Sequence, residues 1–251
     1  MPSISANLNI MIKASEKASK GLIRDFGELE QLQVSIKGPS DFVTNADTKA
    51  EKIIIDELTR SRKNYSILSE ESGSKENKDI DNVWIIDPID GTINFLHGVP
   101  HFAISIALKS NNEIVSGLIY DPIKDEMFYA EKNNGAYFNN KRIRVSKRKK
   151  MEDCLFASGE IDNENFKQQQ MLNYHRKSGS AALDMAYVAS GRYDGYFQKN
   201  LNLWDIAAGI IIVKEAGGQV NDLNLKQNNN INIIASSSSI NEKLLKNLIN
   251  F

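Results

Sequence analysis

The sequence predicts an α/β fold, and three patterns support this. Apolar residues recur at helical spacing over residues 6 to about 30, and a second helical pattern covers residues 46 to about 61. Short runs of β-branched and aromatic residues occupy the middle of the chain. The second half alternates helical and strand patterns, so both kinds of element are expected throughout.

Length and composition are those of an ordinary globular protein. The chain has 251 residues, enough for one large domain or two tightly joined ones. A net charge of −1 gives no global attraction to nucleic acid or membrane, and the single cysteine, Cys154, excludes an internal disulfide and favours core packing. Because there is no signal-peptide pattern and no run of about 18 apolar residues, we expect a cytoplasmic protein that does not enter a membrane.

The first half is expected to begin with the two helices, joined by a loop at residues 37–40. Thr44 and Asp47 resemble a capping pair at the start of the second helix. Strands are expected next, at residues 65–68, 83–86, 102–109, 114–120 and 126–131. Asparagine-rich turns follow from the sequence at residues 111–112, 133–135 and 139–140, and the first of them suits a hairpin.

The second half is expected to contain four helices, near residues 163–175, 181–190, 205–216 and 241–250. Strands are expected near residues 155–158, 193–197 and 231–235. Gly217 and Gly218 end the third of these helices in the manner usual for a helix C-terminus. The sequence has no internal repeats.

Residues 84–95 are the most informative segment. Their apolar start predicts a buried strand, which Pro88 should end because proline has no N–H to donate. Asp87 and Asp90 follow on a turn, just before a Gly-Thr pair. Two such carboxylates suit a hard cation such as Mg²⁺, and free N–H groups at a helix start bind phosphate. An ordinary Asp-Pro and Asp-Gly turn is the alternative explanation.

Two further acidic positions lie far away in the sequence. Glu70 follows the strand expected at residues 65–68, and if that strand pairs with residues 83–86, Glu70 and Asp87 emerge at the same sheet edge. Asp205 stands at the expected start of a helix. A solvated strand end for Glu70 and a simple N-cap for Asp205 are the alternatives.

Taken together, these segments resemble the inositol monophosphatase family of lithium-sensitive phosphatases. The resemblance rests on Glu70-Glu71, on Asp87-Pro88-Ile89-Asp90-Gly91-Thr92, and on Trp204-Asp205 followed by Glu215-Ala216-Gly217-Gly218. Residues 41–47 look like the family's first acidic segment, and residues 179–184 look like its substrate loop. The order and approximate spacing of these segments fit over nearly the whole chain.

The resemblance implies alternating layers of helices and sheets, the sugar-phosphatase fold, in two subdomains. The first, residues 1–140, would carry the metal-binding acidic motifs, and the second, residues 141–251, would supply Asp205 and the substrate loop. The metal site would lie between the subdomains, so that Glu70 and Asp205 could share ions. A homodimer is also expected from the resemblance.

The resemblance also implies two or three Mg²⁺ ions. Glu70, Asp87 and the carbonyl of Ile89 would hold one ion, and Asp87, Asp90 and Asp205 would hold a second. Glu70 would recruit a third, weaker ion through water. Inhibition by Li⁺ is expected at the second of these sites.

Catalytic and substrate-binding roles follow in the same way. The catalytic residues would be Asp47, Glu70 and Thr92, of which Asp47 and Thr92 would position or deprotonate the attacking water. Lys37 would belong to a loop that closes over the site, unless it is a surface lysine. The substrate would be bound by Asp90, Gly91, Thr92, Gly179, Ser180, Ala181 and Gln198.

Two departures from the family pattern concern the substrate. Inositol-selective members commonly carry Glu after two aromatic residues, where this chain has Gln198, a neutral amide that can donate and accept but makes no charge-assisted bond. Many bacterial members have Gly-Phe-Pro where this chain has residues 158–161, and the segment before Gly179 is short. The sequence therefore leaves the substrate wall in this region open.

Other features of the sequence point elsewhere. His97 and His101 are four residues apart, but Gly98 and Pro100 interrupt any helix, which favours packing or loop hydrogen bonds. No serine-hydrolase, Walker A or Rossmann glycine pattern is present. Seven of the ten residues at 141–150 are basic, which would suit a regulator that binds RNA or a transcription complex. A solvated connection is the favoured explanation, because no aromatic residues for stacking on RNA lie among the charges.

We therefore expect an enzyme that hydrolyses a small phosphate monoester with Mg²⁺, and inositol 1-phosphate is the leading substrate. Histidinol phosphate, a sugar bisphosphate and a nucleotide 3′-phosphate are alternatives within the same superfamily. The alternative of another class is the RNA-binding or transcription-complex-binding regulator that uses residues 141–150.

Overall fold

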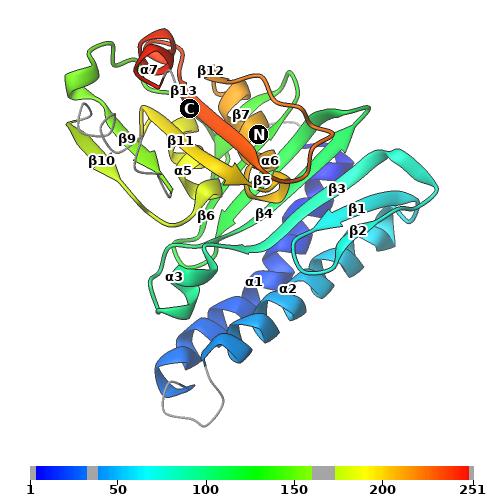
Figure 1. Cartoon of the computed structure of the whole chain (residues 1–251). Helices are drawn as coiled ribbons and strands as arrows, with labels where there is room; N and C mark the ends of the chain where they lie inside the picture. Colours follow the sequence, from blue (N-terminus) through cyan, green and yellow to red (C-terminus); the bar gives the residue numbers. More distant parts are fainter. Residues whose placement is uncertain (1–3, 33–38, 160–172, 249–251) are drawn as a thin grey trace.

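Helices and sheets alternate in layers in the computed structural model, which describes residues 4–32, 39–159 and 173–248 (Figure 1). Helices α1 and α2 cover one face of a large sheet, and α5 and α6 lie between its other face and a smaller sheet. Helix α7 covers the outer face of the smaller sheet. The predicted layered α/β fold is confirmed.

The first layer consists of α1 (Ala6–Leu32) and α2 (Pro39–Ser61). Leu8, Met11, Ala18 and Leu22 recur at helical spacing on α1, and all four are buried against the sheet and α2. Helix α2 begins earlier than predicted, at Pro39, where a missing N–H does no harm in the first turn. The predicted helix start at residue 46 and the capping pair Thr44 and Asp47 are therefore wrong, because both residues lie inside α2.

The larger sheet has eight strands within the described residues, in the order β2-β1-β3-β4-β5-β6-β7-β8. Strand β1 pairs with β3 in parallel, with Ser69 opposite Ile86, so the pairing on which the sequence argument for Glu70 and Asp87 depends is present; the other neighbours are antiparallel. Asn111 and Asn112, with φ of 49° and 62°, form the predicted hairpin turn between β4 and β5. The strand bounds are β1 (Tyr65–Ser69), β2 (Gly73–Lys75), β3 (Asp79–Asp90), β4 (Ala103–Ser110), β5 (Glu113–Asp121), β6 (Glu126–Glu131), β7 (Gly135–Phe138) and β8 (Lys141–Arg142).

Strand β3 does not end at Pro88, as predicted, but continues to Asp90. Its register on β4 changes between Asp87, opposite Ser105, and Asp90, opposite Ala103, so β3 has one extra residue there. A bulge of this kind interrupts the hydrogen-bond ladder and therefore tolerates a proline without an N–H. The short helix α3 (Thr92–Leu96) follows directly, after Gly91 in a left-handed conformation.

The second half supplies the other layers. The smaller sheet has the order β10-β9-β11-β13-β12 in the described part of the chain. Of the helix predicted near residues 163–175, residues 163–172 lie outside the described residues, and the end is wrong because Tyr174–Arg176 forms strand β10. The remaining elements are a 3₁₀ turn (Met151–Asp153), β9 (Leu155–Ser158), α5 (Ala181–Ala189), β11 (Gly195–Leu201), α6 (Leu203–Glu215), β12 (Gly218–Val220), β13 (Ile231–Ser237) and α7 (Asn241–Asn247).

Three apolar cores separate the layers. Side chains of β3 alternate between two of them, with Trp84 and Ile86 toward α1 and α2 and Ile85 toward α6. Both faces of this strand are covered, which explains its unbroken apolar run. The third core lies beneath α7 and contains the buried Cys154, as predicted. Among the described helices, none is long and apolar enough to cross a membrane.

The boundary between residues 140 and 141 stays a prediction. Strand β8, the last of the larger sheet, is formed by Lys141–Arg142, and the smaller sheet begins with β9. Helix α6 lies in the second half of the sequence but packs closely on β4, β5 and β6 of the larger sheet. The two sheets thus share a helical layer, and α6 carries Asp205 into the space between them.

Candidate active site

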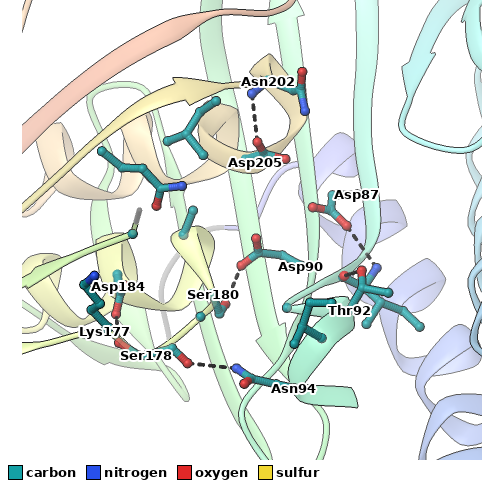
Figure 2. Close-up of a pocket in the computed structure, with 18 of the residues that line it drawn as sticks. Asp87, Asp90, Thr92, Asn94, Lys177, Ser178, Ser180, Asp184, Asn202 and Asp205 are labelled. Carbon is teal, nitrogen blue, oxygen red and sulfur yellow. Dashed lines mark hydrogen bonds between the residues drawn. The ribbon is translucent and has the colours of Figure 1, made fainter. Parts of the chain in front are cut away.

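A pocket of about 530 Å³ lies where β3 turns into α3 and where α5 and α6 begin (Figure 2). The pocket brings together segments that are far apart in the sequence. It is lined by every predicted site residue except Asp47, namely Glu70, Asp87, Ile89, Asp90, Gly91, Thr92, Gly179, Ser180, Ala181, Gln198 and Asp205.

Glu70 is held beside β3 by its backbone, because its N–H donates to the carbonyl of Ile86 (3.2 Å). Glu70 and Asp87 therefore leave the sheet at the same edge, and Glu70 is a half-buried strand end that faces the pocket. The turn after Glu70 is fixed from α2. The buried carboxylate of Glu51 accepts hydrogen bonds from the Glu71 N–H (2.9 Å) and from the Ser72 hydroxyl.

The turn after β3 is fixed by short-range hydrogen bonds. The Ile89 N–H donates to Asp87 Oδ1 (3.0 Å), and the Thr92 hydroxyl donates to the Ile89 carbonyl (3.0 Å). These bonds leave the second lone pair of the Ile89 carbonyl free for another partner. Gly91 has a φ of 101°, and a Cβ there would lie only 3.1 Å from the His101 carbonyl oxygen. Only glycine suits this backbone position.

Asp90 is attached to the start of α5. The Ser180 hydroxyl and the Ala182 N–H (2.8 Å) both donate to Asp90 Oδ2. The same Ser180 hydroxyl accepts a hydrogen bond from the Leu183 N–H (3.2 Å) as the N-cap of α5. The Ser180 side chain thus positions Asp90 in this structure.

Asp205 lies in the first turn of α6, three residues after the N-cap, Asn202. Its Oδ2 accepts a hydrogen bond from the Asn202 N–H (2.8 Å). The prediction that Asp205 itself begins the helix is wrong by this small shift. Asp205 nevertheless both stabilises the helix start and lines the pocket, so its capping role does not exclude a functional one.

Burial of these carboxylates next to one another disfavours their charged forms. Burial raises the pKa of Glu70 and of Asp205 to about 7 each, with further contributions from neighbouring carboxylates. Burial raises the pKa of Asp90 to about 6. The pKa of Asp87 is raised well above its ordinary value by burial and then by Glu70, Asp90 and Asp205. A site of this kind needs positive charge before all its acids can ionise.

The donor atoms fit divalent cations. Of the described residues that line the pocket, five are acidic and one, Lys177, is basic. Among the described residues, no three His, Cys, Asp or Glu side chains are already arranged around a common point as metal ligands. The chemistry of the donor atoms nevertheless suits a hard cation. Carboxylate oxygens with an available backbone carbonyl are the ligands that Mg²⁺ prefers. The residues present therefore fit Mg²⁺.

Asp47 is the predicted catalytic residue that does not line the pocket. Its carboxylate on α2 is 3% exposed, and its Oδ1 has no hydrogen-bond partner. Burial, followed by the charges of Glu71, Glu70 and Glu51, raises its pKa to about 8. Asp47 thus lies close to the acidic turn that follows β1 and is suited to carry a proton near neutral pH.

The opposite wall contains Gln198, which belongs to the pocket rather than to the surface. The buried Tyr196 hydroxyl donates to Gln198 Oε1 (2.6 Å). Gly159 crosses directly beside this amide, because a Cβ at Gly159 would lie 1.9 Å from Gln198 Oε1. The divergent Ser158-Gly159 segment therefore does line the site, while residues 160–172 lie outside the described residues.

The sequence reasoning missed the pocket residues Asn94, Lys177 and Ser178, and it gave no role to Asp184, which it placed only within the substrate-loop segment (Figure 2). Asp184 is 2% exposed and accepts a hydrogen bond from the Ser178 hydroxyl. A single acid within the apolar helix α5 was the available signal for Asp184. Asn94 stands two residues after Thr92, so its place in the same motif was the signal there.

The remaining sequence candidates lie elsewhere. Lys37 lies outside the described residues. His97 is exposed, whereas the His101 ring packs edge-on against Tyr187 at 5.9 Å between centroids. The predicted packing role of His101 is confirmed.

The basic segment, residues 141–150, contains both packed and exposed residues. Ile143 and Val145 pack against the central core, and the Val145 N–H donates to the Ala216 carbonyl (3.1 Å). Arg148 pairs with the fully buried carboxylate of Asp194 (3.2 Å). Part of the segment therefore connects the two sheets, while its other cations are exposed.

Comparison with known proteins agrees with the geometry. The protein-family sequence model described as "Inositol monophosphatase family" matches residues 5–250 of this chain. An inositol-1-monophosphatase of Mesorhizobium japonicum is 44% identical, covering 96% of each chain. A Nus factor SuhB of Escherichia coli is 38% identical, covering 96% of this chain and 95% of its own.

A solved structure is also similar to this chain over nearly its whole length. The extragenic suppressor protein suhB from Bartonella henselae has a TM-score of 0.88 and 44% identity, covering 98% of this chain and 100% of its own. The family match spans nearly the whole chain, and the acidic segments that carry the resemblance meet in one pocket. On both grounds, the chain belongs to the inositol monophosphatase family.

Proposed function

We propose that this protein hydrolyses small phosphate monoesters with Mg²⁺, with inositol 1-phosphate as the leading substrate. One observation carries the proposal. Four carboxylates from three distant segments line one pocket beside the Gly-Thr turn that begins α3: Asp87 and Asp90 are buried, and Glu70 and Asp205 are half-buried. Relatives 41–46% identical are inositol-1-monophosphatases, which supports the same substrate.

The ions would be held by the five ligands that the sequence suggests. Glu70, Asp87 and the Ile89 carbonyl would hold one Mg²⁺, while Asp87, Asp90 and Asp205 would hold another. Bound Mg²⁺ supplies activation of a water molecule and charge stabilisation of the departing oxygen. The hydrogen bonds from Ile89 to Asp87 and from Ser180 to Asp90 keep these carboxylates at the pocket.

The residues of the chain would bind the ester and orient the water. The N–H groups of Gly91 and Thr92 would donate to phosphate oxygens. The Thr92 hydroxyl donates to Ile89, so its oxygen can still accept a hydrogen bond from the attacking water. Asp47 has a pKa of about 8 in the metal-free protein and is then largely protonated, so it would accept the proton that this water loses only after bound Mg²⁺ has restored its charged form.

The leaving group would face Gly179, Ala181 and Gln198. Ring hydroxyls of a polyol can donate to and accept from the Gln198 amide and the loop backbone. A phosphorylated amine would gain no ion pair from Gln198, so histidinol phosphate is a weaker candidate. Sugar bisphosphates and nucleotide 3′-phosphates are the other candidates for the same pocket.

The experiment is a phosphate-release assay over inositol 1-phosphate, histidinol phosphate, a sugar bisphosphate and a nucleotide 3′-phosphate, with Mg²⁺ and with chelator. We expect turnover of inositol 1-phosphate only with Mg²⁺, and uncompetitive inhibition by millimolar Li⁺. The Asp205→Asn variant serves as the inactive control because it removes one charged ligand. Turnover that persists in chelator contradicts the proposal.

The assembly and the regulatory alternative need separate measurements. We infer a homodimer from the family resemblance, and light scattering of the purified protein would measure its mass. Relatives named Nus factor SuhB keep the regulator under consideration. No contact in the described structure favours RNA at residues 141–150, where Arg148 is paired with Asp194.

A further inference from the structure

Asn94, which the proposed chemistry does not use, joins two turns of the pocket. Its Nδ2 donates to the His101 carbonyl and to the Ser178 carbonyl, both at 2.8 Å. His101 precedes β4 and Ser178 belongs to the segment before α5, so one side chain links two parts of the chain that are distant in sequence. Figure 2 shows the bond from Asn94 to Ser178. Both hydrogens of the amide NH₂ group are used in these bonds.

The turn that contains Gly91 and the loop that contains Gly179 are also in direct contact. A Cβ at Gly91 would lie 3.2 Å from the Gly179 carbonyl oxygen, and a Cβ at Gly179 would lie 2.9 Å from Asn94 Nδ2. Both glycines have a left-handed backbone, with φ of 101° and 82°. The turn that would bind phosphate and the loop that would face the leaving group therefore touch without intervening side chains, and Asn94 fixes their separation.

The far side of the same loop is fixed as well. The Ser178 hydroxyl donates to Asp184, a carboxylate that is 2% exposed within α5. Ser178 is thus fixed at its carbonyl by Asn94 and at its hydroxyl by Asp184. Among the described residues that line the pocket, these bonds connect α3 to α5 without involving a proposed metal ligand.

We propose that Asn94 is a positioning residue that selects esters whose leaving group forms hydrogen bonds with the substrate loop. The inference rests on the proposed function and deepens it. A polyol phosphate contacts both the phosphate-binding turn and the loop, so it depends on the separation that Asn94 maintains. Phenyl phosphate has a ring of similar size but no ring hydroxyls, so it forms no hydrogen bonds with the loop and depends on this separation much less.

The test compares two esters in the whole protein with Mg²⁺. The Asn94→Asp variant keeps the size of the side chain but removes both N–H donors and places a carboxylate against two carbonyl oxygens. Asn94→Ala removes the side chain entirely. For both variants we expect KM for inositol 1-phosphate to rise about tenfold or more, as for the loss of two ordinary hydrogen bonds. The kcat/KM for phenyl phosphate and the inhibition constant of inorganic phosphate should change less than about twofold.

Asn139→Asp is the matched control. Its Nδ2 also donates to a carbonyl, that of Asp125 (2.8 Å), but it lies in the turn between β7 and β8, outside the pocket. This variant should have the same KM and kcat/KM as the wild type for both esters. If the Asn94 variants lose activity on both esters equally, Asn94 has only a structural role and the inference fails.

An unchanged ratio between the two esters also overturns the inference, while leaving the proposed function intact. A wild-type protein that releases no phosphate from either ester overturns the proposed function and the inference with it. A variant that does not fold is recognised by its lost thermal transition, and the second variant then decides.

Discussion

Asp90 shows how one carboxylate can serve both structure and chemistry. Its Oδ2 accepts hydrogen bonds from Ser180 and Ala182, at the start of α5. Because both bonds reach the same oxygen, Oδ1 can ligate a cation without breaking either of them. The side chain therefore connects the proposed metal site to the substrate loop.

The first expectation follows from this division of roles. Asp90→Asn keeps a carbonyl oxygen for Ser180 and Ala182 but removes a negative charge from the proposed metal site. The rate of phosphate release should fall about a hundredfold or more, as for loss of a major electrostatic group, and the Mg²⁺ concentration needed for half activity should rise. The melting temperature in chelator should not fall, because a buried acid with a raised pKa is replaced by a neutral amide. Near-normal activity would exclude Asp90 as a ligand.

Gln198 is a second residue whose role depends on a neighbour. Tyr196 donates to its Oε1, so the amide presents its NH₂ group as the principal donor toward the pocket. A carboxylate at this position would offer only acceptors. The chemistry of position 198 thus decides whether the leaving group is read by a donor or by an acceptor.

The second expectation concerns substrate selectivity. Gln198→Glu should sharpen the preference for inositol 1-phosphate over glycerol 2-phosphate by about five- to tenfold in kcat/KM, the difference between an ordinary and a charge-assisted hydrogen bond. Tyr196→Phe should make the enzyme less selective than the wild type, because the Gln198 amide loses its hydrogen bond to Tyr196 and can rotate to exchange its oxygen and NH₂ group. Mg²⁺ dependence should stay the same in both variants. Unchanged ratios would remove Gln198 from the substrate wall.

At the scale of elements, α6 is positioned by a close approach to β5. A Cβ at Gly117 on β5 would lie 2.6 Å from the Ile211 Cγ2 atom and 2.7 Å from the Ala208 carbonyl oxygen. A Cβ at Gly209 on α6 would likewise lie 2.6 Å from the sulfur of Met185 on α5. Small residues at these contacts therefore let the helix carry Asp205 to the pocket.

The third expectation tests this packing. Gly117→Ala should destabilise the fold by about 1–3 kcal/mol, because the extra methyl group overpacks a closed contact, and should lower activity through displacement of Asp205. Gly21→Ala on α1 is the control, since a Cβ there meets nothing within 4 Å. It should leave activity unchanged and raise stability by about 0.5–1 kcal/mol, as expected within a helix. Chemical denaturation measures the free energy of unfolding of both variants. A Gly117→Ala variant as stable as the wild type would contradict the close approach of α6 to β5.

The connection between the sheets combines an ordered and a solvated part. Arg148 pairs with the buried Asp194, and the Lys149 carbonyl accepts from Lys243 (2.9 Å). The side chains of Lys147, Lys149 and Lys150 are exposed. Removing Arg148 would leave a buried carboxylate without its cation, so a test of RNA binding must spare it.

The fourth expectation separates enzyme from regulator at this segment. Replacing Lys147, Lys149 and Lys150 together by Gln should leave phosphatase activity and melting temperature unchanged. RNA affinity should be weak in both forms. Tight RNA binding with a steep salt dependence that is lost in the triple variant would instead support the regulator. Arg148→Gln, as a comparison, should lower stability without changing KM.

For the whole molecule, the concentration of acids between the layers links stability to metal and pH. The pKa values of Glu70 and Asp205 are raised by burial to about 7 in the folded protein, well above their ordinary values. The folded protein then holds protons that the unfolded chain releases. Its extra stability is present below the ordinary pKa values near 4 and is lost as pH rises through about 7.

The fifth expectation is that the metal-free protein melts at lower temperature as the pH rises from about 5 to about 8. Mg²⁺ should reverse this loss, because it binds the ionised carboxylates and competes with protons. The difference in melting temperature between Mg²⁺ and chelator should therefore widen with pH. Calorimetry over this range checks it. A melting temperature in chelator that rises with pH would contradict the raised pKa values.

The sequence by itself determined the local order of elements and most of the chemistry. The apolar run at residues 83–86 predicted the buried part of β3, and the asparagine pair predicted the hairpin between β4 and β5. These features depend on neighbours within a few residues, where spacing and turn propensity decide. The motif resemblance likewise identified eleven of the residues that line the pocket, but not Asn94, Lys177 or Ser178.

Only the tertiary structure decided features that depend on distant contacts. Strand β3 passes Pro88 because β4 accommodates a bulge there. The Ser180 hydroxyl binds Asp90, and Asn94 joins Ser178 to His101, because the layers bring α5 against the turn after β3. Hydrogen bonds of this kind leave no periodic trace in a sequence, since each needs a partner that only folding brings within about 3 Å.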